Sequence, residues 1–224
     1  MRTRLQRVSL LAVEKETPMQ SQYREFREKL SPGTVLFFRL GDFYEVFGED
    51  AVVAAKVLGL TLTKRHETPM AGLPHHAAPA YVNRLLAAGW KVAICDQLEA
   101  PVAGKLVRRG LTRILTPGTA LEDSQLDSRR GNYLAAISWD KQGWHAAWLD
   151  VSTADFRLAT DASPARLLPL LHSVSPREII LLEGLEPPAE HREALEVFLL
   201  GRAVSRLPGW NFDGAAGARL VAQT

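Results

Sequence analysis

The chain of 224 residues contains one cysteine, Cys95. A lone cysteine cannot form an internal disulfide, and it excludes zinc sites that need two or more cysteine ligands. Apolar runs of the roughly 20 residues that cross a bilayer are missing too. The basic first 16 residues lack the long apolar core of a signal peptide. These absences predict a protein of the reducing cytosol without a membrane partner.

Two motifs of phosphate chemistry are also missing. A phosphate-binding loop needs G-x-x-x-x-G-K-[ST], but Gly104 and Lys105 lack the upstream glycine and are followed by Leu106. The Asp/Glu-x-Lys triplet of many nucleases does not occur either. We therefore expect that this chain is not an enzyme and binds no cofactor by itself.

The net charge is only +2, but it is unevenly divided. Residues 1–130 hold 19 Lys/Arg and 14 Asp/Glu, whereas residues 131–224 hold 8 and 11. A basic segment followed by an acidic one indicates that the first alone meets a polyanion such as DNA. A solvated basic surface with no such partner would show the same modest excess.

The first half has the periodicity of a mixed α/β unit. Helices are expected at about 17–30, 49–58 and 79–88, where apolar residues recur at helical spacing. Runs rich in β-forming residues predict strands at 34–40, 43–47, 60–65, 90–97 and 106–116. A loop is expected around Pro69, Gly72 and Pro74.

The second half has a different texture. Strands are predicted at 133–139, 144–151, 154–160, 178–183 and 203–207, with helices at 163–172 and 189–200. This order predicts a second α/β layer domain. We divide the chain into an N-terminal arm (1–16), a first domain (17–120), a polar linker (121–130) and a second domain (131–224). The second domain is expected to be incomplete.

Residues 39–47 read R-L-G-D-F-Y-E-V-F and place Phe43 directly after a Gly-Asp turn. An exposed aromatic wedge is how proteins enter a base step from the minor groove and kink the duplex. Glu45, two positions later on a strand, would point to the same face as Phe43. A carboxylate is unfavourable beside phosphates, so Glu45 would address a base edge if it touched DNA. From spacing alone, a core role for Phe43, Tyr44 and Phe47 is the commoner outcome.

Several motifs, in the same order, resemble those of the MutS family of bacterial DNA mismatch-repair proteins. They are the 39–47 segment, T-L-T-K-R (61–65), T-P-M-A-G-L-P-H-H-A (68–77), V-A-I-C-D-Q (92–97) and V-R-R-G-L-T-R-I-L-T-P-G-T (107–119). The resemblance covers residues 17–119 closely and residues 131–210 more loosely. It implies a mixed-sheet α/β mismatch-recognition domain followed by a truncated RNase H-like α/β connector domain.

The resemblance also implies roles for individual residues. Phe43 would stack on a mispaired base while Glu45 accepts a hydrogen bond from that base. DNA backbone or groove contacts would come from Lys64, Arg65, Met70, Pro74 and Arg108. A mispaired step is easier to open and bend than a correct pair, so a wedge converts duplex deformability into recognition.

The same resemblance implies the partners. They are double-stranded DNA with mismatches or small loops, a MutL-type protein that contacts the connector domain, and a second copy in the full-length protein. The full-length protein would also use ATP and Mg²⁺. The implied location is the bacterial cytosol, in association with the nucleoid.

Other readings of the chain stay open. Strand alternation sends Lys105, Arg109 and Arg113 to different faces, so a DNA contact is open for each. His75-His76 lack nearby cysteine or acidic partners, which favours packing or hydrogen bonding over a metal site. A structure-specific nuclease would need a pair of metal ions held by carboxylates, for which the candidates are Asp140, Asp150, Asp155 and Glu178. Several of these are common turn positions. A pure protein-interaction module is the remaining alternative.

Overall fold

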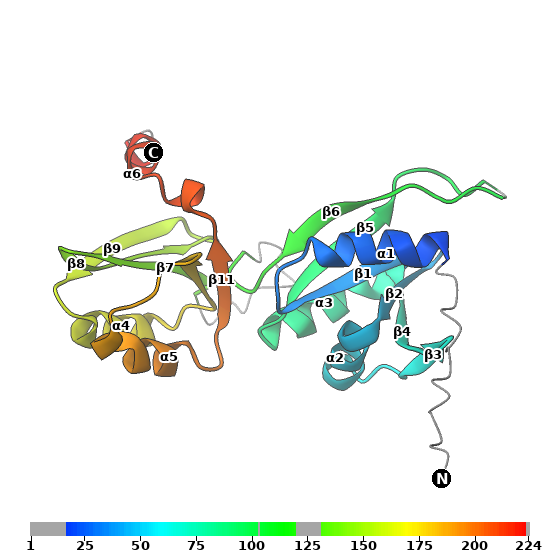
Figure 1. Cartoon of the computed structure of the whole chain (residues 1–224), viewed down its shortest axis with the longest axis horizontal. Helices are drawn as coiled ribbons and strands as arrows, with labels where there is room; N and C mark the ends of the chain where they lie inside the picture. The colour runs from blue at the N-terminus through cyan, green and yellow to red at the C-terminus, as the bar shows by residue number, and fades with distance from the viewer. Residues whose placement is uncertain (1–16, 103, 120–130, 223–224) are drawn as a thin grey trace, which may run out of the picture.

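The computed structural model describes residues 17–102, 104–119 and 131–222, which form two α/β units (Figure 1). The first unit is built on a six-stranded sheet and the second on a five-stranded sheet. The expected arm (1–16) and linker (121–130) lie outside the described residues. Within the described ranges, no helix is long and apolar enough to cross a membrane.

The first sheet has the strand order β3-β4-β2-β1-β5-β6, in which only β1 and β5 run parallel. Its strands are β1 (Thr34–Leu40), β2 (Phe43–Phe47), β3 (Thr63–Arg65), β4 (Thr68–Pro74), β5 (Lys91–Gln97) and β6 (Arg109–Leu115). Helix α1 (Pro18–Glu28) covers one face, and α2 (Gly48–Leu58) and α3 (Ala78–Ala87) cover the other (Figure 1). A short 3₁₀ turn, η1 (His75–Ala77), precedes α3.

Local sequence explains where α1 begins and what it covers. The Thr17 hydroxyl accepts a hydrogen bond from the Gln20 amide, and the Gln20 side chain accepts one from the Thr17 amide, so both exposed donors are satisfied. Tyr23 then packs edge-on against Phe38 and Phe47, with ring centroids 5.4 and 4.9 Å away. The helix therefore anchors on the middle of β1 and the end of β2.

The loop expected around Pro69, Gly72 and Pro74 is wrong, because these residues belong to β4. This strand pairs with β2 through residues 70–74 and with β3 through residues 68–70. Pro69 lies outside the stretch paired with β2, and Pro74 lies outside the stretch paired with β3. Neither proline, with its missing N–H, therefore interrupts a ladder on both sides.

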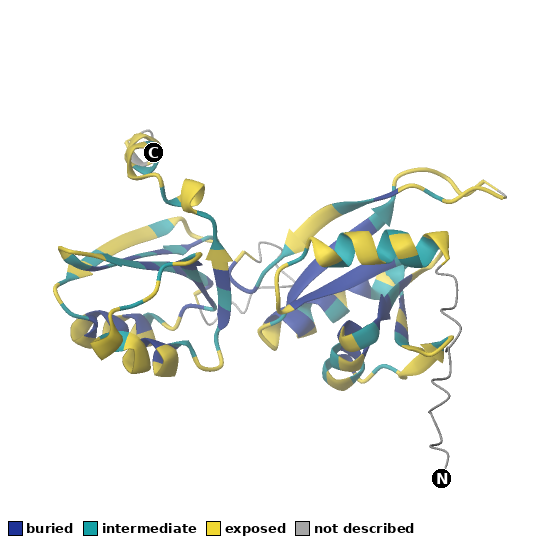
Figure 2. Ribbon diagram, viewed as in Figure 1, coloured by how far each residue is buried: buried dark blue, intermediate teal, exposed yellow. Residues whose placement is uncertain are grey.

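The second sheet has the order β11-β10-β7-β8-β9, with β7, β8 and β9 antiparallel and β10 and β11 parallel to β7. Its strands are β7 (Tyr133–Asp140), β8 (Gly143–Asp150), β9 (Asp155–Asp161), β10 (Glu178–Leu182) and β11 (Ala203–Leu207). Helices α4 (Pro164–Val174) and α5 (Arg192–Leu199) lie side by side on one face, over a core that includes two tryptophans of β8. Figure 2 shows the central strands buried and the outward helix faces exposed. The α/β class expected for both units is confirmed.

Three short elements complete the second unit. Two 3₁₀ turns, η3 (Ala189–His191) and η4 (Gly209–Phe212), precede α5 and the last helix. That helix, α6 (Gly214–Val221), was not expected from the sequence, although Asp213 caps it by accepting hydrogen bonds from the Ala215 and Ala216 amides.

A buried carboxylate lies where the two units meet. Glu178 is 2% exposed, and its Oε2 accepts a hydrogen bond from the Gly118 amide at 3.1 Å. Its other carboxylate oxygen accepts from the Ser205 hydroxyl. Lys91, at the start of β5, donates to the Val204 carbonyl of β11 at 3.1 Å. Burial lowers the pKa of Lys91, and the nearby Glu178 partly offsets that effect. We call these contacts the junction.

Candidate nucleic-acid interface

Phe43 is the first residue of β2, where it is paired with Leu40 of β1 and Pro74 of β4. The preceding turn needs Gly41 at φ +59°, and the Asp42 carbonyl is held by the His75 amide at 2.9 Å. The residue Phe43 is 50% exposed, whereas Tyr44 and Phe47 are 6% and 8% exposed. The core role considered for all three aromatics therefore applies only to the last two.

Glu45 shares the face of Phe43, as the strand period predicts. It lies opposite Phe38 of β1 and Gly72 of β4. The side chain is 19% exposed, and its Oε2 accepts a hydrogen bond from Arg65 Nη1 at 2.5 Å. This ion pair was not foreseen from the sequence.

The pairing register decides which other predicted residues join this face. Met70 lies opposite Phe47, and Pro74 lies opposite Phe43, so both side chains share the face of the aromatic wedge. Arg65 lies opposite Thr68, which is four residues from Gly72 on β4 and therefore on the same side. The structure thus brings Phe43, Glu45, Arg65, Met70 and Pro74 together; we call these five residues the reading face.

Lys64 and Arg108 lie apart from the reading face. Lys64 is opposite Pro69 and so points to the other side of β3, where it forms an exposed ion pair with Glu67 at 3.6 Å. Arg108 is exposed just before β6, and its backbone amide donates to the Glu99 side chain at 2.8 Å. Lys64 and Arg65 therefore point to opposite sides of β3, and a role for one does not imply the same role for the other.

Arg109 belongs to the interior of the first unit. It is 7% exposed, its Nε donates to the Arg39 carbonyl at 2.8 Å, and its Nη1 donates to Gln22 Oε1 at 2.8 Å. Its guanidinium lies 4.8 Å from the centre of the Phe38 ring, and burial lowers the pKa of Arg109. The burial of Arg109 disfavours the DNA contact that the sequence left open for it, while Lys105 and Arg113 are exposed.

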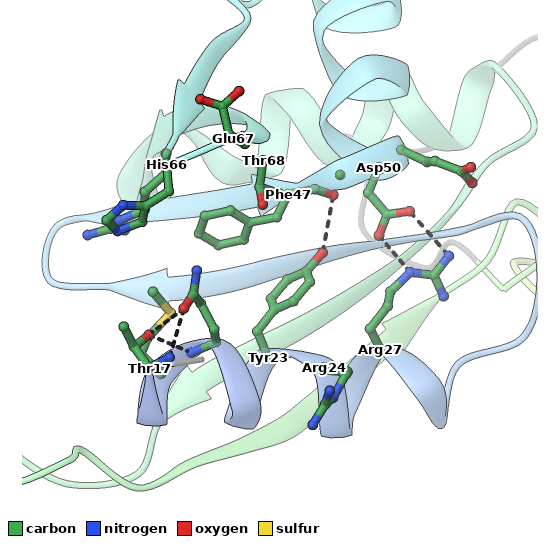
Figure 3. Close-up of a pocket in the computed structure, with 14 residues that line it drawn as sticks. Thr17, Tyr23, Arg24, Arg27, Phe47, Asp50, His66, Glu67 and Thr68 are labelled. Atoms are coloured by element: carbon green, nitrogen blue, oxygen red, sulfur yellow. Dashed lines mark hydrogen bonds and ion pairs between the residues drawn. The ribbon is translucent and has the colours of Figure 1, made fainter. Parts of the chain in front are cut away.

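A cleft of about 890 Å³ opens beside the reading face, between α1, the start of α2 and the turn that joins β3 to β4 (Figure 3). Its walls are held by internal bonds: the Tyr23 hydroxyl donates to the Phe47 carbonyl, and Arg27 pairs with Asp50 at 3.0 Å. Burial raises the pKa of Asp50, although the Leu36 amide and Arg27 act in the opposite direction. Arg65 lines the same cleft, so it lies between this open space and Glu45.

Two family models match the chain: MutS domain I over residues 17–124 and MutS domain II over residues 132–223. The chain belongs to the MutS family. The DNA mismatch repair protein MutS of Myxococcus xanthus is 45% identical over 207 residues, which cover 90% of this chain and 23% of that protein. The MutS of Symbiobacterium thermophilum is 43% identical over 219 residues, covering 93% and 25%. The chain spans about a quarter of the length of these curated relatives.

The MutS match confirms the resemblance drawn from the motifs and places the chain in a DNA mismatch-repair family. The six-stranded sheet and α1 to α3 fall within the segment matched by MutS domain I. The whole five-stranded sheet falls within the segment matched by MutS domain II. The reading face therefore lies entirely in domain I.

The carboxylates considered for a nuclease serve other contacts in domain II. Asp150 accepts hydrogen bonds from the Ser152 amide and hydroxyl and from the Asn132 amide, and the Ser152 bond lowers the pKa of Asp150 most. Asp140 and Asp155 accept from turn or strand neighbours, and Glu178 belongs to the junction. Across the ranges that the structure describes, no group of three or more His, Cys, Asp or Glu side chains could hold a metal ion.

Proposed function

We propose that this chain is the mismatch-reading and connector part of a MutS-type protein, and that it binds double-stranded DNA containing mismatches or small loops. The observation that carries the proposal is Phe43, a half-exposed aromatic at the end of a rigid sheet, on the same face as Glu45. Single exposed apolar side chains are common, so the exposure of Phe43 gains its meaning from its place in the family motif 39–47, within the segment matched by MutS domain I, and from Glu45 on the same face.

In this proposal Phe43 enters the base step at the mispair and stacks on the displaced base. Unstacking a step costs a few kcal/mol, and the cost is lower where pairing is already defective. Glu45 accepts a hydrogen bond from the displaced base, while Met70 and Pro74 contact the groove beside the wedge. Lys64 and Arg108 contact phosphates from outside the reading face and Arg65 contacts the DNA backbone from within it, so binding depends on salt.

The other partners belong to the proposal as well. Domain II would contact a MutL-type protein, and dimerisation, ATP and Mg²⁺ would involve parts of the full-length protein outside this chain. No catalytic residue is proposed here, because the candidate carboxylates already serve structural contacts.

A competition experiment tests the proposal. A labelled duplex with one G·T mismatch is bound to the chain at low salt and displaced with matched, mismatched or single-base-loop competitors. We expect the defective duplexes to compete better by about 5- to 150-fold, the range that about 1–3 kcal/mol of discrimination produces. Equal competition by all duplexes would refute mismatch reading, and Mg²⁺-dependent cleavage of the mismatched duplex would favour the nuclease instead.

A further inference from the structure

Glu45, the proposed base-reading carboxylate, is ion-paired with Arg65. The two side chains come from β2 and β3, which are separated in the sheet by β4. The ion pair therefore crosses β4 on the reading face. Gly72, directly opposite Glu45, presents no side chain that would obstruct this approach, and even an added Cβ there would meet nothing closer than 3.9 Å.

The pair addresses an electrostatic problem that any base-reading carboxylate has. Duplex DNA presents a dense row of negative phosphates, so an unpaired carboxylate brought to its surface is repelled. The positive charge of Arg65, 2.5 Å from the Glu45 carboxylate, offsets this repulsion. Its planar guanidinium suits a carboxylate and a phosphate equally well, because both offer two oxygens at a matching spacing.

Arg65 is also the more exposed partner of this ion pair. Its side chain is 41% exposed and lines the cleft beside the reading face, whereas Glu45 is only 19% exposed and is confined between β1 and β4. When the pair opens, Arg65 is therefore the partner that moves, and Glu45 stays near its position against the sheet.

We propose that Arg65 is a positioning residue that pairs with the Glu45 carboxylate, offsets its charge and keeps it aligned until a mispaired base arrives, and then transfers to a backbone phosphate and leaves Glu45 to the base. This inference rests on the proposed function. On matched DNA no base is displaced toward Glu45, so the Glu45–Arg65 pair remains closed. A mismatch thus adds one phosphate contact that a matched duplex does not receive.

The salt dependence of binding reports how many phosphates are neutralised, and it therefore detects this additional contact. The slope of log K against log salt changes by about 0.9 for each phosphate neutralised on B-DNA. For the unmodified chain, the slope on G·T duplex should exceed the slope on matched duplex by about that amount. Arg65→Gln should abolish this difference, and Arg65→Lys should restore it because the slope depends on charge. Glu45→Gln should also abolish the difference, by releasing Arg65 to phosphate on both duplexes.

Lys64→Gln is the matched control, since Lys64 is the sequence neighbour of Arg65 and points to the opposite side of β3. As a phosphate contact on either duplex, Lys64 should contribute equally to both slopes, so its replacement should lower both and preserve the difference. Equal slopes for the unmodified chain, with Arg65→Gln lowering both by one phosphate, would overturn the transfer and leave Arg65 as a constant backbone contact.

A measurement without DNA tests the pair independently of the proposed function. The urea midpoints of Glu45→Gln, Arg65→Gln and the double variant form a cycle that should be non-additive if the two side chains interact in solution. Additive shifts would overturn the positioning role even where mismatch preference is intact. If the unmodified chain showed no mismatch preference but the cycle were non-additive, the proposed function alone would fail.

Discussion

Replacing Phe43 with alanine should remove the proposed wedge and leave the fold intact. Fully burying a phenylalanine side chain contributes about 1.5–3 kcal/mol, and Phe43 is 50% exposed, so truncation should cost about 1 kcal/mol of unfolding free energy. The backbone of β2 remains paired with β1 and β4 on both sides. Phe43→Ala should therefore fold, with a urea midpoint only slightly below that of the unmodified chain.

On DNA the same change should cost more, and only at a mismatch. Stacking of a base on an aromatic ring contributes about 1–3 kcal/mol, which corresponds to about 5- to 150-fold in Kd. That contribution exists only where the base step opens for the ring. Phe43→Ala should therefore reduce affinity for G·T duplex toward the value for matched duplex, and matched-duplex affinity should change little.

Fluorescence anisotropy with the two labelled duplexes measures both affinities in one series. Phe156→Ala supplies the matched control, because Phe156 lies in β9 of the second unit and is 45% exposed. Its truncation should cost a similar amount of stability and leave both affinities unchanged. If Phe43→Ala kept the preference for G·T over matched DNA, the wedge assignment would be refuted.

Three further predictions concern the fold. Burial raises the pKa of the Cys95 thiol to about 12, so a thiol reagent at about pH 8 should label the chain only after unfolding. Prompt labelling of the folded chain would contradict the burial of Cys95. The hydrogen bond from Ser152 lowers the pKa of folded Asp150 below its unfolded value near 4, so the stability that this group contributes is present above about pH 4 and is lost as pH falls through the folded pKa. Over this window the urea midpoint of Asp150→Asn should fall less than that of the unmodified chain. Parallel pH profiles for the two proteins would count against the assignment. A Cβ on Gly118 would lie 2.8 and 2.9 Å from neighbouring side-chain atoms, so Gly118→Ala should cost about 1–3 kcal/mol of unfolding free energy. A Cβ on Gly217 would have no atom within 4 Å, so Gly217→Ala should not destabilise the chain. Equal urea midpoints for the two variants would show that the junction accommodates the extra methyl group.

Local patterns predicted most of the elements, because their signals lie within a few residues. Thr17 and Gln20 marked the start of α1, and Gly59 marked the end of α2 in the left-handed conformation. Two elements, β4 and α6, were not predicted because their local sequence favours other structure. The prolines and glycine of β4 are typical of a loop, and the glycines at 214 and 217 weaken the helical signal of α6.

The candidate site was predicted in part. The two-residue period placed Phe43 and Glu45 on one face, and the structure agrees. The partner of Glu45 could not be predicted, because Arg65 is 20 residues away and reaches it only once β3 and β4 have formed beside β2. Burial of Arg109 under α1 likewise depends on Gln22, 87 residues distant, so its charge alone was misleading.

The junction and the wedge lie at opposite ends of the same pair of strands. β5 begins at Lys91, which is bonded to β11 of the second unit, and runs parallel to β1, whose last residue Leu40 pairs with Phe43. β1 is seven residues long and spans about 23 Å. The pairing places Thr34 opposite Lys91 at one end of β1 and Leu40 opposite Phe43 at the other. The proposed DNA contact and the contact between the two units are therefore carried by the same pair of strands.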